Sequence, residues 1–168
     1  MELWDAYDAQ GKSTGQTLVR GEPIPKGCYH MVCEALVRHA DGDYLLMRRD
    51  ERKKAYPGYL EATAGGSALC GEDALACMRR ELREETGITD AALTLVARSR
   101  DDGEKALFFS YLALTDCDKD SIVLQEGETV EFAWVSEQAF VAYLHSDRVI
   151  DRQRARFADY FRSIGYLT

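Results

Sequence analysis

The chain has 168 residues, of which 46% are hydrophobic and 30% charged, so it is long enough to fold as a single domain, 1–168, around one core. The formal net charge of -8 argues against nucleic-acid binding, and no apolar run is long enough for a membrane anchor. Met1–Asp5 is neither basic nor apolar, so we expect no leader peptide and a cytoplasmic protein. The cysteines show no CxxC spacing and are expected to be reduced thiols.

The first 27 residues predict an N-terminal hairpin, because two strand-like runs, Leu3–Tyr7 and Gln16–Arg20, flank a polar turn. Residues 28–135 follow as the expected core. Strands are predicted there at Tyr29–His39, Tyr44–Arg49, Leu93–Arg98, Ala106–Leu114 and Thr129–Val135, with a helix at Glu72–Thr86. The dipeptide Asp41-Gly42 is a strong hairpin signal between the first two of these strands.

Residues 136–168 are expected to supply the last two helices. Ser136 is a predicted N-cap for a helix that runs to about His145, and an amphipathic pattern predicts another from Asp151 to Ile164. Strands before and after a helix, followed by two closing helices, predict a mixed sheet covered on both faces. Periodicity alone leaves the fold class as α/β or α+β.

The helix predicted at 72–86 carries the most informative residues of the chain. It has no Pro or Gly, and Gly87 is placed for a left-handed C-terminal cap. On a helical wheel a stripe for packing is followed by an acidic arc. The predicted packing stripe is Leu75, Met78 and Leu82, and the arc is Glu81, Glu84 and Glu85.

Two of the three carboxylates lie in the last turn of the helix, where the helix dipole disfavours negative charge. Glu81 and Glu85 also repel each other, because they are like charges four residues apart. A cation should offset both effects. Mg²⁺ is suitable, because it prefers hard oxygen ligands and completes its shell with water and phosphate oxygens. In isolation the same acidic arc would be an ordinary solvated face paired with Arg79, Arg80 and Arg83. Glycines directly before the helix favour the metal site, because they let the backbone approach an ion or a phosphate.

The motif extends over nine positions in one register. They are Gly66, Glu72, Arg80, Glu81, Leu82, Glu84, Glu85, Gly87 and Ile88. This run resembles the Nudix box, the signature of enzymes that cleave diphosphates of nucleosides linked to another group. The resemblance implies an α/β/α sandwich with a mixed β-sheet, and metal ligation by the Gly66 carbonyl and by Glu81, Glu84 and Glu85. Arg80, one turn before Glu84, is expected to orient the carboxylates rather than to contact substrate.

Shorter motifs resemble the branch of this superfamily related to isopentenyl-diphosphate isomerase. They are Trp4-Asp5-Ala6-Tyr7-Asp8, Gly27-Cys28-Tyr29-His30 and the basic run from Arg48 to Gly58. The resemblance implies that Arg49 and Lys53 hold the diphosphate of the substrate. It does not carry the isomerase chemistry, because the positions of the catalytic cysteine and of a metal-binding histidine are Gly65 and Ser67 here. His30 matches another isomerase metal position, but without its partner it is expected to be structural.

These observations predict Mg²⁺-dependent hydrolysis, with Mn²⁺ as a substitute, of a diphosphate bond in a nucleoside diphosphate or a nucleotide-linked small molecule. A carboxylate must accept the proton of the attacking water, and the candidates are Glu84, Glu128 and, ranked after Glu128, Glu131. Two alternatives are a prenyl diphosphate isomerase and a noncatalytic nucleotide-binding module. The expected partner is a small-molecule diphosphate, with no nucleic acid and no membrane, and the resemblance also allows a homodimer.

Overall fold

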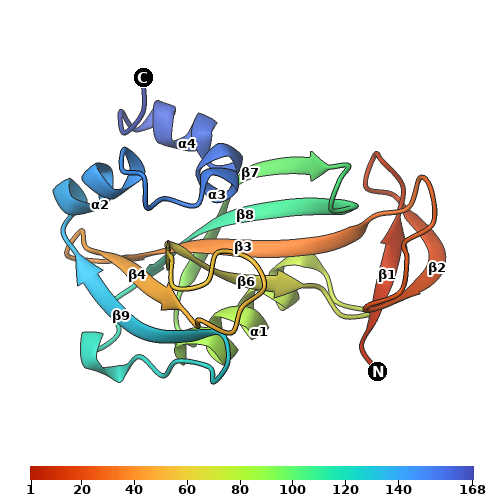
Figure 1. The fold of residues 1–168 in the computed structure, drawn as a ribbon, viewed down its shortest axis with the longest axis horizontal. Helices are drawn as coiled ribbons and strands as arrows, with labels where there is room; N and C mark the ends of the chain where they lie inside the picture. Colours follow the sequence, from red (N-terminus) through yellow and green to blue (C-terminus); the bar gives the residue numbers. More distant parts are fainter.

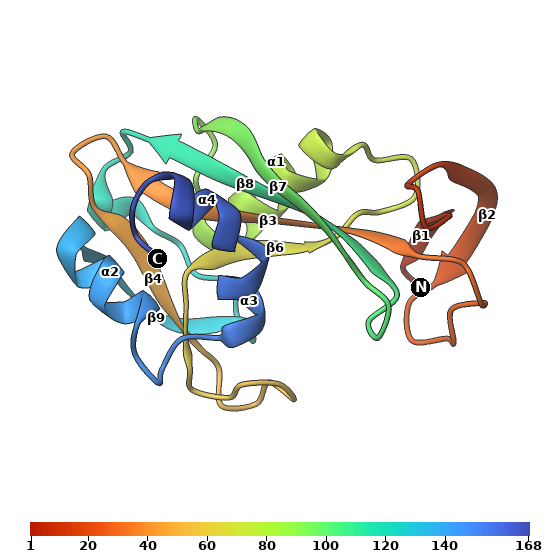
Figure 2. The ribbon, with the colours of Figure 1, turned by 90° about the horizontal axis from the view of Figure 1, so that it is seen from above.

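A computed structural model describes all residues from Met1 to Thr168. A mixed seven-stranded sheet lies between helices on both faces, and a separate two-stranded hairpin lies at one end of the molecule (Figures 1 and 2). The strands are β1 Leu3–Tyr7, β2 Ser13–Val19, β3 His30–His39, β4 Tyr44–Arg49, β5 Leu60–Glu61, β6 Thr63–Ser67, β7 Ala92–Asp101, β8 Ala106–Thr115 and β9 Thr129–Val135. The helices are α1 Ala74–Thr86, α2 Glu137–Leu144, α3 Asp151–Arg156 and α4 Ala158–Ser163, with a 3-10 turn at Lys119–Ser121.

Strand β3 is the centre of the sheet. It runs parallel to β8 over its whole length and antiparallel to β6 from Val32 to Leu36. The predicted Asp41-Gly42 turn is confirmed, with Gly42 at a φ of 103°. The two strands that it joins diverge after one pair, Arg38 with Tyr44, and β4 then pairs with β5 and β9 instead. The turn therefore separates two halves of the sheet.

Alternate side chains of β3 enter two different cores, as the period of two in a strand requires. Met31, Cys33, Ala35 and Val37 pack with α1 on one face. Leu36 belongs to the other core, which the C-terminal helices α2–α4 complete on the opposite face (Figure 1). The expected α/β sandwich with a mixed sheet is thus confirmed. No helix of the structure is both long enough and apolar enough to cross a membrane.

The N-terminal hairpin is also confirmed, although β2 begins at Ser13 rather than at Gln16. It has a small core of its own, formed by Trp4, Ala6, Leu18 and Cys28. A bridge between Tyr7 and Tyr29 joins it to the start of β3, and Figure 2 shows it beyond the end of the main sheet.

Several predicted boundaries in the helices are wrong. Helix α1 begins at Ala74, because Asp73 is the N-cap and accepts a hydrogen bond from the Ala76 amide at 2.8 Å. Leu75 does not belong to the packing stripe and is 40% exposed, because the buried face of α1 consists of Cys77, Met78, Leu82, Glu85 and Thr86.

The predicted C-terminal helix from Asp151 to Ile164 is interrupted at Phe157, and the two pieces are α3 and α4. The interruption involves no Gly or Pro, and Phe157 and Phe161 are both buried in the core beneath α2–α4. Strands β5 and β6 were not predicted. Strand β6 contains Gly65 and Gly66, so these glycines lie in the sheet rather than in a loop.

Candidate active site

Helix α1 presents its acidic arc to an open cavity of about 280 Å³. Burial of Met78 and Leu82 against the sheet fixes the rotation of the helix, so that the arc faces the edge formed by Gly65 and Gly66. The cavity is lined by Glu2, Arg20, Lys53, Gly65, Gly66, Ser67, Leu69, Arg80, Glu81, Glu84, Glu85, Gln125 and Glu128. All four predicted metal ligands therefore lie around one cavity, which we call the carboxylate cavity.

Arg80 is the centre of the hydrogen-bond network in this cavity. Its guanidinium donates to Glu72 at 2.7 and 2.9 Å, to Glu81 at 2.6 Å and to Glu84 at 3.2 Å. It also donates to the Ser67 carbonyl at 3.1 Å. The bonds from Arg80 lower the pKa of Glu72, whereas burial raises the pKa of Glu81 in spite of its bond to Arg80. Arg80 thus bonds to three carboxylates of the site, and its orienting role in the reaction stays a prediction.

Glu85 lies deepest of the three carboxylates on the acidic arc. One of its oxygens accepts a hydrogen bond from the Gly65 amide at 2.9 Å. Burial raises the pKa of Glu85 well above its usual range, and the nearby carboxylates of Glu61, Glu81 and Glu128 raise it further. Such a concentration of buried negative charge is what a bound cation would relieve.

Gly65 is required by the close approach of the neighbouring strand rather than by an unusual torsion angle, whereas Gly66 faces a flexible side chain. A Cβ on Gly65 would lie 2.1 Å from the Cys33 carbonyl oxygen of β3. A Cβ on Gly66 would lie 2.6 Å from a carboxylate oxygen of Glu81. The absence of a side chain at Gly66 therefore leaves the space that the Glu81 carboxylate occupies.

The residues around this cavity fit a divalent cation by their chemistry, since they offer carboxylate and carbonyl oxygens beside buried negative charge. In the present arrangement no three acidic, histidine or cysteine side chains converge on one point. Arg80 and the Gly65 amide instead hold the oxygens of Glu81 and Glu85. An ion bound by Glu81 and Glu84 would compete with Arg80 for their oxygens.

A second cavity of about 170 Å³ adjoins the first and shares Lys53, Gly65, Glu85 and Glu128 with it. We call it the inner cavity. Its remaining walls are strongly polar and come from β3, β4, β5, β6, β8 and α3. They are Val32, Cys33, Glu34, Arg49, Glu61, Thr63, Phe108, Gln153 and Arg156.

The inner cavity contains an ion pair that sequence reasoning missed. Arg156 of α3 donates to both oxygens of Glu34 at 2.6 Å, and its guanidinium carbon lies 4.2 Å from the centre of the Phe108 ring. Ser110 donates to Glu34 as well, at 2.8 Å. A lone Glu34 within the apolar run of β3 was the available signal, since a buried acid needs a partner.

The predicted substrate-binding residues Arg49 and Lys53 both line the inner cavity, and each already has a carboxylate partner. Arg49 pairs with the buried Glu61 at 2.6 Å and also donates to the Ala55 carbonyl. Lys53 pairs with Glu128. A substrate that used either cation would therefore share it with a carboxylate.

The structure separates the two later glutamates proposed as proton acceptors. Glu128 lines both cavities, whereas Glu131 lies on β9, exposed and paired with Arg48 at 2.8 Å, and lines neither.

His30 has the expected structural surroundings. Its ring stacks on Trp4 at 4.3 Å, and its Nδ1 lies 3.2 Å from the Ser67 hydroxyl.

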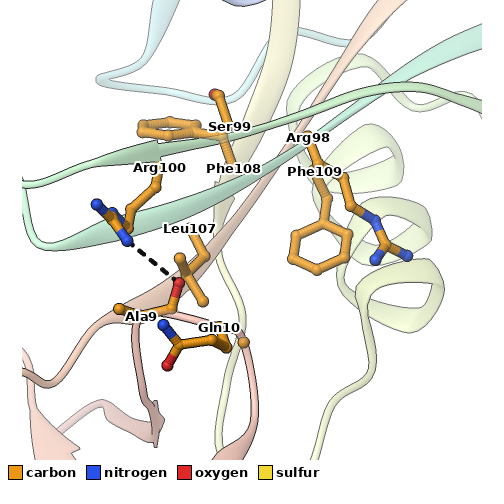
Figure 3. Close-up of a pocket in the computed structure, with 9 residues that line it drawn as sticks. Ala9, Gln10, Arg98, Ser99, Arg100, Leu107, Phe108 and Phe109 are labelled. Atoms are coloured by element: carbon orange, nitrogen blue, oxygen red, sulfur yellow. Dashed lines mark hydrogen bonds between the residues drawn. The ribbon is translucent and has the colours of Figure 1, made fainter.

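A third cavity, of about 280 Å³, lies between the turn of the N-terminal hairpin and strands β7 and β8, and shares only Phe108 with the inner cavity (Figure 3). None of the predicted site residues lines it. Arg100 reaches across it and donates to the Ala9 carbonyl at 3.4 Å, which ties the hairpin turn to β7 (Figure 3).

A mixed sheet between helices, with one helix that presents clustered glutamates to a glycine-containing strand, defines the architecture of a Nudix-type hydrolase domain. A family model described as "NUDIX domain" matches residues 29–156 of this chain. The chain therefore belongs to the Nudix family.

Proteins similar to this chain support the same assignment. An uncharacterized Nudix hydrolase of Listeria monocytogenes is 28% identical over 150 residues, which cover 89% of each chain. An uncharacterized Nudix hydrolase of Yersinia pestis is 32% identical over 143 residues, which cover 84% of this chain and 77% of the relative. The crystal structure of DR0079 from Deinococcus radiodurans has a TM-score of 0.69 at 19% identity, covers 88% of this chain and 91% of its own, and shows the shared fold.

The chain therefore belongs to a family whose similar members are described as hydrolases. The specific likeness to the isopentenyl-diphosphate isomerase branch is not confirmed by these relatives, which are described as Nudix hydrolases.

Proposed function

We propose that this chain hydrolyses a diphosphate bond in a nucleoside diphosphate or a nucleotide-linked small molecule, with Mg²⁺ as its cofactor and Mn²⁺ as a substitute. The observation that carries the proposal is that the two cavities adjoin, with Lys53, Gly65, Glu85 and Glu128 in the walls of both. Acidic residues suited to a cation line the first, and polar residues suited to the rest of a nucleotide line the second. Nudix enzymes in general use divalent metals, which agrees with the oxygen donors found here.

Glu81, Glu84, Glu85 and the Gly66 carbonyl would hold the metal. When bound, Mg²⁺ would neutralise charge on the phosphate oxygens and assist ionisation of the attacking water. Arg80 keeps the carboxylates of Glu81 and Glu84 in place.

In the proposed reaction a water oxygen forms a bond to phosphorus while the bond from phosphorus to the bridging oxygen breaks. The proton of the water passes to a carboxylate oxygen. Glu128 is our first candidate for this acceptor, because it lines both cavities, and Glu84 is the second. Glu131 lines neither cavity and is paired with Arg48, so it is not a candidate in the arrangement described.

The lining of the inner cavity supports a polar substrate rather than a prenyl diphosphate. Glu34, Glu61, Arg49 and Arg156 are charged groups in its walls, and an isoprenoid chain placed against them would exclude water from these ion pairs without offering a hydrogen bond in return. Gly65 also lacks the thiol that an isomerase of this family requires, and steric contact with β3 leaves no space for one.

The test is a phosphate-release screen in Mg²⁺ with nucleoside di- and triphosphates, dinucleotides, nucleotide sugars and prenyl diphosphates. Release should stop with excess EDTA and return with Mg²⁺ or Mn²⁺. Glu84→Gln and Glu85→Gln should each lower kcat by at least ~10². Asp90→Asn is the matched control, since Asp90 is an exposed acid just beyond α1 that lines neither cavity.

Near-normal turnover in both glutamate variants would remove these residues from the mechanism. Binding of a nucleotide without release of phosphate from any compound would favour a noncatalytic nucleotide-binding module.

We also propose a cytoplasmic location, supported by five free cysteines, which suit a reducing compartment. The net charge of -8 supports a small-molecule partner rather than a nucleic acid. A homodimer is a further proposal, which analytical ultracentrifugation would test.

A further inference from the structure

The N-terminal hairpin contributes two side chains, Glu2 and Arg20, to the wall of the carboxylate cavity. Both residues lie outside the stretch 29–156 that defines the family. We propose that Arg20 binds a phosphate group of the substrate, so that the hairpin is part of the active site. This inference rests on the proposed function and adds to it a residue that determines substrate binding.

The hairpin is held firmly against the loop that precedes α1. The Asp5 carboxylate accepts a hydrogen bond from the Gly71 amide at 2.7 Å, and the Leu3 carbonyl accepts one from the Cys70 amide at 2.8 Å. At the other end of the hairpin, Arg100 binds the Ala9 carbonyl (Figure 3). Anchors at both ends fix the position of the strands, and therefore the point from which the Arg20 side chain projects.

The other cations of the carboxylate cavity are already engaged. Arg80 donates to three carboxylates and a carbonyl, and Lys53 pairs with Glu128. Neither can turn fully towards a phosphate without leaving a carboxylate unpaired, which is costly in a partly buried site.

Arg20 also has a carboxylate partner, Glu2 at 2.8 Å, but it differs in exposure: its side chain is 65% exposed, against 26% for Lys53 and 17% for Arg80. An exposed pair of this kind contributes little to stability, so exchanging the carboxylate for a phosphate costs little. A guanidinium also matches phosphate geometry with two parallel hydrogen bonds.

Glu2 would stay in place after such an exchange. Its other oxygen accepts a hydrogen bond from the Trp4 indole at 2.8 Å, and Trp4 is buried against His30. Glu2 therefore competes with the substrate for Arg20, and the two residues should have opposite effects on binding when each is changed.

The experiment uses the full-length chain and methylenediphosphonate, a diphosphate that cannot be hydrolysed, with Mg²⁺ present. Its affinity is measured by titration calorimetry for wild type, Arg20→Ala, Arg20→Lys and Lys26→Ala. Lys26 is the matched control, because it is an exposed cation that follows β2 and lines neither cavity. Kinetic constants are measured in parallel on whichever of ADP, GDP, CDP and UDP is hydrolysed fastest.

We expect Arg20→Ala to weaken methylenediphosphonate binding about tenfold and to raise KM by a similar factor while kcat changes less than about threefold. Arg20→Lys should lie between Arg20→Ala and wild type, and Lys26→Ala should match wild type. Glu2→Gln keeps an acceptor for Trp4 and should tighten binding, and this gain should vanish in the double variant Glu2→Gln/Arg20→Ala.

Unchanged binding in Arg20→Ala would overturn the inference. Equal losses in Arg20→Ala and Glu2→Gln would overturn it as well, because they would show a structural pair rather than a phosphate ligand. If wild type binds methylenediphosphonate through Arg20 but hydrolyses no diphosphate, the proposed function fails and the binding role of Arg20 stands.

Discussion

Replacement of Arg80 by alanine should lower the stability of the protein far more than replacement of its neighbour Arg79. Arg80 is 17% exposed in its side chain and bonds to Glu72 and to Glu81, which is 12% exposed. Arg79 is exposed, although it is the adjacent residue of α1. The two arginines thus have the same chemistry on the same helix in different surroundings.

The loss of unfolding free energy in Arg80→Ala should lie between two limits. An exposed ion pair contributes about 0–1 kcal/mol, and removing one partner of a buried pair costs about 3–5 kcal/mol. Because removal of the Arg80 guanidinium leaves the largely shielded carboxylates of Glu72 and Glu81 without a cation, and Glu72 keeps only its bond from the Leu69 amide, we expect a loss of about 2–4 kcal/mol in the free energy of unfolding. For a chain of this size that corresponds to a fall in Tm of roughly 5–15 °C.

Urea unfolding at pH 7 in EDTA measures the effect, and the same titration at lower pH tests its cause. Arg80 lowers the pKa of Glu72 below its ordinary value of 4.5, so this contribution is present above pH 4.5 and is lost as the pH falls through the lowered pKa. Glu81 has a raised pKa and becomes neutral at a higher pH than Glu72. The difference between wild type and Arg80→Ala should therefore shrink on acidification. Equal stability of the Arg79→Ala and Arg80→Ala variants at pH 7 would refute the reasoning.

Three further predictions concern single positions. Gly65→Ala should lower Tm by more than about 5 °C in a thermal scan, because its Cβ would lie 2.1 Å from the Cys33 carbonyl oxygen, and an unchanged Tm would show that β3 and β6 separate easily. Phe140→Ala should cost about 3–5 kcal/mol in urea unfolding, since the ring is fully buried, and a cost below about 1 kcal/mol would contradict the packing described. Glu128→Gln should lower kcat at least about tenfold while Glu131→Gln leaves it unchanged, and the reverse order in a phosphate-release assay would exchange their roles.

Most of the fold was predictable because its signals are local. The strands around Asp41-Gly42, the helix that ends at Gly87 and the cap at Ser136 were all predicted within a few residues of their observed bounds. Strand β6 was not, because Thr63–Ser67 is a run of small residues without alternating hydrophobic positions. Its pairing with β3 depends on close backbone contact, which a propensity does not measure.

The candidate site was predictable to a similar extent. The acidic arc on α1 follows from helical periodicity, and the structure does bring it to one cavity with Gly66. The inner cavity was not predictable, because Glu34 and Arg156 are separated by 122 residues and meet only in the folded chain. Arg20 was missed for the same reason, since nothing in the sequence around β2 indicates that Arg20 lines the same cavity as Glu84.

The contact between Gly65 and β3 also limits how this enzyme could change its chemistry over evolution. A glycine codon can become a cysteine codon by one base change, which would place a thiol at the position that the resemblance to isopentenyl-diphosphate isomerase assigns to the catalytic cysteine. Here the Cβ that carries the thiol would lie 2.1 Å from the Cys33 carbonyl oxygen of β3. A lineage that started from this sequence would first have to shift those strands apart, so the route from hydrolase to isomerase requires several linked substitutions rather than one.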